Sequence, residues 1–499
     1  MKTRIIAFLL AVFCFAGAFV ACDSGSQTDK TEQTSSSAET ITEVSPAETE
    51  TEAPTDHPTI ERTNYNDDLF LHVFERPQLL WVKESENDVF TEALYTRQQK
   101  LYEYLGVEMT AIQTGNLEVY GNDFKNAVKN KDGSVDVLIC SAYVSIASFI
   151  VEGYLTKYSK FDQIDLSADY WKTDYMEEVM IEGDVYLGYS NFNIFNTHVI
   201  SYNKDMLDKY SDALDESIYD TVRNYRWTID KMISLASLVY VDQTADGKTE
   251  DDIFGITGRQ WIPFIGFLHA CDIPLVAQNE SGNYEVAVYN DLNKEKTTTL
   301  VEKLYNLSKS NSAWFRYRIE ETTEIPLTSG RTLMSIVSTP NIVNYLNYDI
   351  NFGILPFPMF DEDQKDVGYR SYNYDGFITF PSYMRNPDMS VETMEILSFL
   401  SDPVQTAYYE KQLGKQAADA PDDSEMLVII WDGICTDFGS ALSQIDASLG
   451  KNLYMLPTLT HANTTENVAS YVKTYQDTGN RAIATWIKKY EKMMKKDSL

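Results

Sequence analysis

Apolar and polar residues recur along the chain with two different periods, and these periods predict its secondary structure. Residues 89–105 (VFTEALYTRQQKLYEYL) carry apolar side chains at helical spacing with charges between them, and a short strand is expected at 106–110. Residues 135–140 (VDVLIC) form an apolar, β-rich run that is typical of a buried parallel strand. The pattern at 145–152 predicts a helix that ends at Gly153. Strands and helices in quick succession favour an α/β fold over an all-β fold.

Further amphipathic patterns predict helices along the rest of the chain. They cover residues 123–128, 225–240, 294–308, 391–400, 403–412 and 469–494. Thr228 stands where the 225–240 pattern becomes regular, and we expect its hydroxyl to cap the helix. The sequence shows no internal repeat of the length used by solenoids or propellers.

The first 22 residues predict export and lipidation. Lys2 and Arg4 precede an apolar run, 5–20, that is too short to span a membrane comfortably, which is the layout of a signal peptide over residues 1–21. The segment Phe19-Val20-Ala21-Cys22 resembles a bacterial lipobox, with Phe19 in place of the usual Leu. The resemblance implies that Cys22 is acylated and anchors the protein to the extracytoplasmic face of the cell membrane. The alternative is an ordinary signal cleavage, with Cys22 incidental.

A polar linker is expected at 22–64, before the folded body. Residues 23–60 include 15 Ser or Thr, nine acidic residues and one Lys. Such a composition buries too little apolar surface to offset the entropy of ordering, so we expect a disordered tether. About 440 residues follow it, which is more than one ordinary core and predicts two lobes.

Composition restricts the partners. The formal net charge is −34, and loss of Lys2 and Arg4 with the signal peptide makes it two units more negative. This charge repels nucleic acid and anionic headgroups, so we expect no nucleic-acid partner and membrane contact only through the lipid. A neutral or cationic ligand suits such a protein better than a polyanion.

No cofactor or metal site is predicted. Cys140, Cys271 and Cys435 lie in apolar contexts without metal-ligand spacing, which favours buried free thiols. The five histidines are scattered, at positions 57, 72, 198, 269 and 461. The segment 242–252 (DQTADGKTEDD) begins like an EF-hand loop, but position 12 is Ile253 instead of Glu. We interpret this segment as an acidic surface turn, with a weak calcium site as the alternative.

Several motifs occur in the order found in one known family. They are VDVLICSAYVSIASFIVEGYLTKYS (135–159), GDVYLGYSNFNIFNTHVISYNKDML (183–207), WTID (227–230), SGRTLMSI (329–336), INFGILPFPMFDE (350–362) and YDGFITFPS (374–382). Together they resemble the extracellular solute-binding proteins of bacterial ABC importers, in the carbohydrate-binding branch related to maltose-binding protein. Leu333 departs from the Ala that is usual in the family.

The resemblance implies a fold and a set of partners. The fold is a two-lobe, periplasmic-binding-protein-like α/β fold (type II), whose lobes are joined by crossing strands and enclose the ligand. It implies a first lobe of residues 65–197 plus 331–383 and a second of 198–330 plus 384–499. A sugar or oligosaccharide is the expected ligand, the membrane subunits of an ABC permease are the expected protein partners, and a monomer is the expected state.

Candidate ligand-binding residues follow from the same resemblance, position by position. Sugar rings need aromatic planes for their apolar faces, and amides or carboxylates for their hydroxyls. The candidates are Ser141, Tyr143, Asn193, Asn196, Trp261, Tyr372, Tyr374, Asp375 and Trp431, with Gln260 and Asp432 as further possibilities. Trp171 fits packing better than ligand contact. Core packing is equally open for Trp261 and Trp431, and Asp375 could simply cap a turn with Gly376.

Two other classes of protein share part of this pattern. A lipid-anchored glycoside hydrolase needs two carboxylates at a defined separation, and no nucleophile, metalloprotease or phosphate-loop motif is present. A structural surface lipoprotein fits the strand and helix order less well. The expectation is therefore a receptor that is not an enzyme, although its ligand could also be a peptide or a polyamine.

Overall fold

The computed structural model describes residues 57–497, except 58, 87, 114–116, 195, 318–324, 414–420 and 462–466. The folded unit begins at His57. The predicted signal peptide, Cys22 and the tether up to residue 56 lie outside the described residues.

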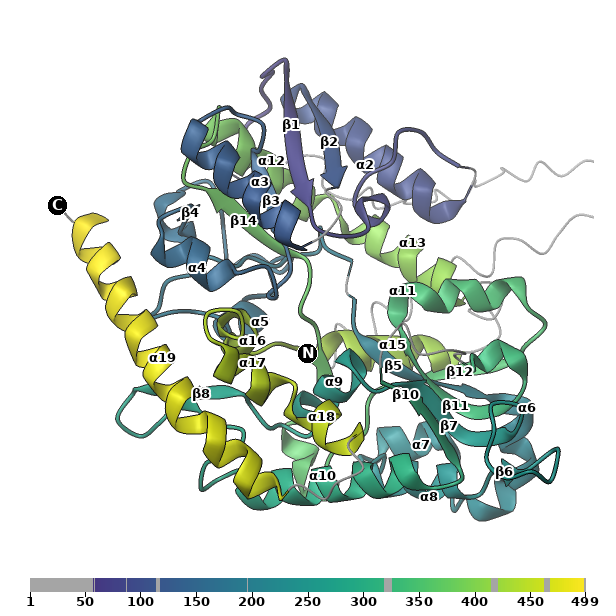
Figure 1. Cartoon of the computed structure of the whole chain (residues 1–499). Helices are drawn as coiled ribbons and strands as arrows, with labels where there is room; N and C mark the ends of the chain where they lie inside the picture. The colour runs from purple at the N-terminus through teal and green to yellow at the C-terminus, as the bar shows by residue number, and fades with distance from the viewer. Residues whose placement is uncertain are drawn as a thin grey trace, which may run out of the picture. The chain divides into compact units, whose positions relative to one another are not determined.

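A five-stranded mixed sheet forms the centre of the first lobe (Figure 1). Its strand order is β2 (Val107–Gln113), β1 (Asp67–Val73), β3 (Val137–Cys140), β14 (Phe377–Pro381) and β4 (Leu155–Thr156). β1 pairs in parallel with β2 and β3, whereas β14 runs antiparallel to β3. All four residues of β3 are buried, as the apolar run at 135–140 predicted.

A second mixed sheet forms the centre of the second lobe. Its strand order is β10 (Ala313–Arg316), β7 (Ile253–Arg259), β11 (Thr332–Ser338), β5 (His198–Asn203) and β12 (Phe352–Leu355), with β6 (Tyr240–Val241) paired to β7. β11 pairs with β7 and β5, and β12 pairs with β5. The assignment of 331–383 to the first lobe is therefore wrong for β11 and β12, because their backbone hydrogen bonds belong to the second sheet.

Each predicted helical pattern coincides with a helix, although several bounds differ and no pattern predicted the helices at Ile262–Ala270 and Pro421–Asp432. α2 spans Val89–Leu105 and ends where Gly106 adopts a left-handed conformation, and Thr228 accepts the amide of Lys231 at the start of α8. The other helices that cover predicted patterns or flank the sheets are α3 (Leu117–Asn130), α4 (Ile146–Val151), α8 (Ile229–Ser237), α9 (Ile262–Ala270), α10 (Lys294–Lys309), α12 (Pro387–Phe399), α13 (Asp402–Leu413), α15 (Pro421–Asp432) and α19 (Val468–Asp497).

Shorter elements complete the two lobes. They are α5 (Thr173–Glu177), α6 (Lys204–Leu207), α7 (Ile218–Arg223), α11 (Thr339–Ile342), α16 (Phe438–Leu442), α17 (Ala447–Leu453), α18 (Met455–His461), the strand pair β8 (Val276–Gln278) and β9 (Tyr284–Val286), and the pair β13 (Ser371–Tyr372) and β15 (Ile434–Cys435). α12 and α13 pack on α2. The assignment of 384–499 to the second lobe is therefore wrong for these two helices.

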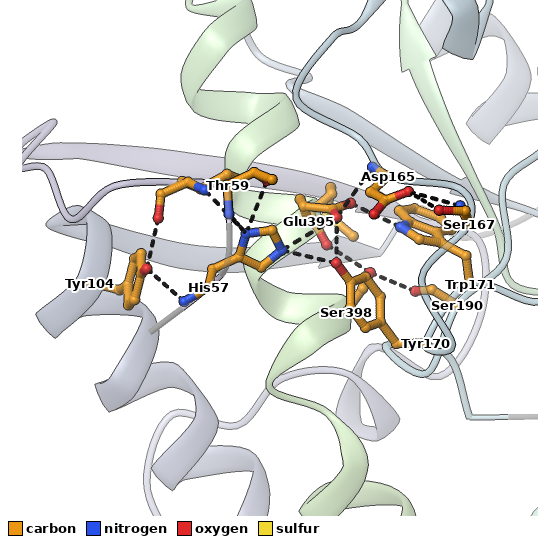
Figure 2. Close-up of polar contacts among 12 residues, drawn as sticks. His57, Thr59, Tyr104, Asp165, Ser167, Tyr170, Trp171, Ser190, Glu395 and Ser398 are labelled. Carbon is orange, nitrogen blue, oxygen red and sulfur yellow. Dashed lines mark hydrogen bonds and ion pairs between the residues drawn. The ribbon is translucent and has the colours of Figure 1, made fainter. Parts of the chain in front are cut away.

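The beginning of the folded unit is held by a buried polar cluster (Figure 2). His57 is 6% exposed, and its backbone amide donates to Tyr104 Oη at 2.8 Å. Its Nε2 lies 3.4 Å from the buried carboxylate of Glu395, which also accepts Trp171 Nε1 at 2.8 Å. Trp171 therefore packs in the core, as expected. The folded unit begins before the predicted linker ends, since the Thr63 amide donates to the Tyr104 carbonyl at the end of α2.

Two segments that pass between the lobes lie side by side. Thr197, just before β5, forms an antiparallel bridge with Asn373, between β13 and β14. The Thr197 hydroxyl also donates to the carbonyl of Tyr372 at 2.8 Å. Several predicted site residues are thus brought to the junction of the two sheets, since Asn196 and Asp375 flank these segments.

Cys140, Cys271 and Cys435 are buried free thiols, as predicted. Within the described residues, no helix is both long and apolar enough to cross a bilayer.

Candidate functional site

A small polar cavity lies at one edge of the first sheet. β1 and β3 are parallel, so both end at this edge, and antiparallel β14 begins there. The cavity has a volume of about 50 Å³, room for one or two water molecules at about 30 Å³ each. Its polar lining comes from Glu75, Arg76, Ser141, Asn193, Asn196 and Asp375. Four of the nine predicted binding residues therefore line one cavity.

Hydrogen bonds fix the positions of these side chains. Asn196 Nδ2 donates to Asp375 Oδ2 at 3.1 Å, and Asn193 Nδ2 donates to the carbonyl of Gly376 at 2.5 Å. Ser141 Oγ donates to the carbonyl of Tyr374 at 3.2 Å. Asp375 thus holds Asn196 of the neighbouring connecting segment, which is more than capping the turn at Gly376.

Three polar atoms in this group are buried without a hydrogen-bond partner within the described residues. They are Asp375 Oδ1, Asn196 Oδ1 and Arg76 Nη1. Arg76 also has a left-handed backbone, with φ of 54°, a conformation uncommon for residues other than glycine. Buried polar groups are normally satisfied, so the three atoms are available to partners that water or a bound ligand would supply.

The carboxyl of Asp375 has a raised pKa. Burial raises the pKa of its carboxyl to about 7, and the nearby Glu75 carboxylate adds to the rise. The side chain therefore titrates near neutral pH, where it can change between a donor and an acceptor.

A group of tyrosines adjoins the cavity. The hydroxyls of Tyr143 and Tyr372 are hydrogen-bonded at 2.9 Å, and Tyr372 Oη also bonds Ser440 Oγ at 2.6 Å. The Tyr143 and Tyr374 rings lie 4.9 Å apart, and His269 stacks on Tyr372 at 3.9 Å. Tyr143 and Tyr372 are buried, whereas Tyr374 is partly exposed. Tyr374 is therefore the predicted tyrosine best placed to offer a surface to a ligand.

The two predicted tryptophans lie in different surroundings. Trp261, just before α9, is half-buried and stacks on Tyr454 at 4.4 Å. Trp431 lies at the end of α15, with Lys172 Nζ 4.3 Å above its ring, and it is not among the residues that line the cavity. Trp261 thus belongs to an aromatic group of the second lobe. Trp431 belongs neither to that group nor to the tyrosine group beside the cavity.

Two further candidate residues lie outside the cavity, and two residues that line it were not predicted. Gln260 is buried, and Asp432 is exposed beside Trp431; neither lines the cavity. Glu75 and Arg76 line it but escaped sequence reasoning. The alternation in DDLFLHV at 67–73 could have identified them, because it predicts a strand and these two residues follow the end of that strand.

Among the described residues, no group of three or more His, Cys, Asp or Glu side chains is arranged around a common metal position. The 242–252 segment is a largely exposed turn in which the Gly247 amide donates to Asp242 Oδ2 at 3.1 Å.

Comparisons with known proteins agree with this architecture. A family model described as bacterial extracellular solute-binding protein matches residues 99–417. No curated protein matches the chain. The ABC substrate-binding protein of Listeria monocytogenes in complex with cycloalternan aligns over 84% of this chain and 99% of its own, with a TM-score of 0.51 and 12% identity. The GacH receptor of Streptomyces glaucescens, solved unliganded and with acarbose, aligns over 86% and 98%, with a TM-score of 0.52 and 15% identity. The predicted two-lobe fold is thereby confirmed.

Proposed function

Because the chain belongs to the bacterial extracellular solute-binding proteins, we propose that it captures a sugar or oligosaccharide and delivers it to the membrane permease of an ABC importer. The observation that carries the proposal is the set of three unpartnered polar atoms, on Asp375, Asn196 and Arg76, at the junction of the lobes. Hydroxyl groups both donate and accept, so a polyol can satisfy all three. Both structural neighbours were solved with a carbohydrate-like ligand, cycloalternan or acarbose.

The cavity would take only one end of such a ligand. Its volume of about 50 Å³ is too small for a sugar ring, so the ring would lie against side chains of both lobes. Tyr374 and Trp261 are partly exposed aromatic rings that suit this contact. Of the nine predicted residues, we propose that Asp375, Asn196, Asn193 and Ser141 bind hydroxyls and that Tyr374 and Trp261 bind ring faces.

Anchoring at the membrane is part of the same proposal. An extracellular solute-binding protein works outside the cytoplasm, and acylated Cys22 would hold it there by a tether that ends at His57. The hydrogen bonds of His57 would then fix the point at which the tether leaves the folded unit. We propose that the protein binds its ligand without changing it.

Thermal unfolding with a panel of ligands tests this function. We expect one class of oligosaccharide to raise the unfolding free energy by about 2.7 kcal/mol at a hundredfold excess over its Kd, and to be recovered intact. Peptides and polyamines serve as the other arms of the panel. Release of shorter products would favour a glycoside hydrolase, and stabilisation by peptides alone would contradict a sugar ligand.

Single substitutions then locate the binding surface. Trp261→Ala should weaken affinity by about 1–3 kcal/mol with the fold intact, because a sugar ring loses its aromatic plane. Trp431→Ala is the matched control, because the Trp431 ring lies against Lys172 and outside the aromatic group of Trp261, and it should leave affinity unchanged. Equal losses from the two variants would contradict the proposed surface.

A further inference from the structure

A second and larger hollow lies away from the cavity, between α19 and α4. It has a volume of about 850 Å³ and is lined along one side by α19, from Thr478 to Lys496. The other side comes from α4, the residues just after it and the loop at Ile445 and Asp446. Figure 1 shows α19 as the long terminal helix, in yellow, and α19 contacts α4. We call this hollow the α19 groove.

The α19 wall of the groove is cationic. Arg481, Lys489, Lys492 and Lys496 line it, and all four residues are exposed. Their spacings of eight, three and four residues put them on one stripe of the helix. No ion pair is formed by any of the four within the described part of the chain, although the protein has a net charge of −34. Uncompensated cations in so acidic a protein indicate attraction for an anionic partner.

The floor and the opposite wall differ from the cationic wall. Val151, Ile445, Ala482, Trp486 and Met493 supply apolar surface along the groove. The opposite wall carries Glu152, which is 3.2 Å from Lys125, and Asp446, which accepts the Ser448 amide at the start of α17. Trp486 Nε1 donates to the Ala147 carbonyl at 2.9 Å, so the two walls are joined by a buried hydrogen bond.

The groove has one cationic wall and one wall with carboxylates, and this difference favours some anionic partners over others. A flat bilayer cannot enter a concave groove, and a uniform polyanion would meet the carboxylates of Glu152 and Asp446. An amphipathic helix can present acidic residues on one edge and apolar residues toward the floor. We propose that the α19 groove binds an amphipathic helix of a partner protein, with its acidic edge against Arg481, Lys489, Lys492 and Lys496.

The length of the cationic stripe sets the length of the partner helix. Fifteen residues separate Arg481 from Lys496, which corresponds to about 22 Å at 1.5 Å per residue. A partner helix of about four turns matches this span. Its acidic positions should recur every three or four residues, as the cations do, and its adjacent stripe should be apolar.

A designed peptide provides the probe. We would use a labelled helix of about 16 residues with a Glu edge and a Leu stripe, and measure its binding to the full chain, with Cys22→Ser to prevent lipidation, by fluorescence anisotropy. Lys489→Glu with Lys496→Glu should weaken binding by about tenfold or more. Lys488→Glu with Lys495→Glu is the matched control, because these lysines have the same spacing on the same helix but do not line the groove; it should change affinity by less than about threefold.

Other outcomes would overturn the proposal. Equal losses from the two double variants would show unspecific attraction to α19. Equal binding of a peptide with Lys in place of Glu, or no binding of the Glu peptide, would also contradict it. Stronger binding to vesicles of phosphatidylglycerol and phosphatidylcholine, or to polyphosphate, would identify a different anionic partner. Circular dichroism of each variant confirms that the fold is retained.

Discussion

Asp375 combines two roles at the junction of the lobes: it holds Asn196 through one carboxylate oxygen and leaves the other without a partner. Its position before β14 fixes the first role, since β14 starts beside the end of β3. The buried setting that leaves Oδ1 unpaired also raises the pKa of the carboxyl to about 7. The residue is therefore able to link ligand binding to pH.

The affinity for a hydroxyl ligand should depend on pH through Asp375. A hydroxyl that donates to the carboxylate stabilises the ionised form, so binding releases a proton. We expect affinity to rise as the pH increases through about 7, by up to tenfold per unit below that value, and then to level off. Titration calorimetry from about pH 5.5 to 8.5 measures this, and Asp375→Asn should flatten the profile. Identical profiles for the two proteins would contradict the role of Asp375.

At the residue scale, sequence reasoning found the groups that follow recognisable strands. Ser141 comes directly after β3, and the motif that contains it placed it correctly at the sheet edge. Glu75 and Arg76 were missed because acidic residues at 67 and 68 and His72 obscured β1. Trp431 could not be judged from sequence, because its contact with Lys172 joins residues more than 250 positions apart.

At the level of elements, the helices could be predicted because their signals are local. The apolar spacing of α2, its Asp88 cap and its Gly106 end all lie within 20 residues. Lobe membership depends instead on pairing between distant strands. β11 joins β5 across more than 120 residues, and no local pattern shows whether a buried apolar strand belongs to one sheet or the other. This is why the predicted lobe boundaries were wrong there.

The contact of β7 with α8 leads to a prediction at the same scale. A Cβ on Gly255 would lie 1.7 Å from the carbonyl oxygen of Ala236, which is backbone and cannot rotate away. Gly255→Ala should therefore destabilise the fold by about 1–3 kcal/mol, because strand and helix must separate. Urea unfolding measures the loss.

Gly121→Ala is the control for this substitution. Gly121 lies within α3, and a Cβ there would be 3.5 Å from Phe149, an ordinary contact. Alanine also favours the helix by up to about 1 kcal/mol, so this variant should be neutral or more stable. A Gly255→Ala protein as stable as the Gly121→Ala protein would contradict the close approach of Ala236 in α8 to Gly255 in β7.

For the whole molecule, charge is distributed unevenly. The chain carries 75 acidic residues against 41 basic ones, yet the last turns of α19 gather exposed lysines at 488, 489, 492, 495 and 496. α19 also touches both lobes, through Trp486 and the Ala147 carbonyl and through Asn480 and the Val286 amide. A partner seated on the α19 groove would therefore contact the first lobe and a helix that is fixed to the second.

The same excess of acid predicts how salt affects stability. Repulsion among like charges opposes the compact state, and its range falls from about 30 Å at 10 mM salt to about 10 Å at 100 mM. With a net charge of −34, the melting temperature should rise by several degrees between 10 and 300 mM sodium chloride. Differential scanning calorimetry measures the rise, and sucrose at equal osmolality separates screening from solute exclusion. Lys488→Glu with Lys495→Glu makes the net charge four units more negative and should steepen the salt dependence of the melting temperature. A melting temperature that falls with salt would instead mean that ion pairs, such as Lys204 with Asp423, outweigh the repulsion.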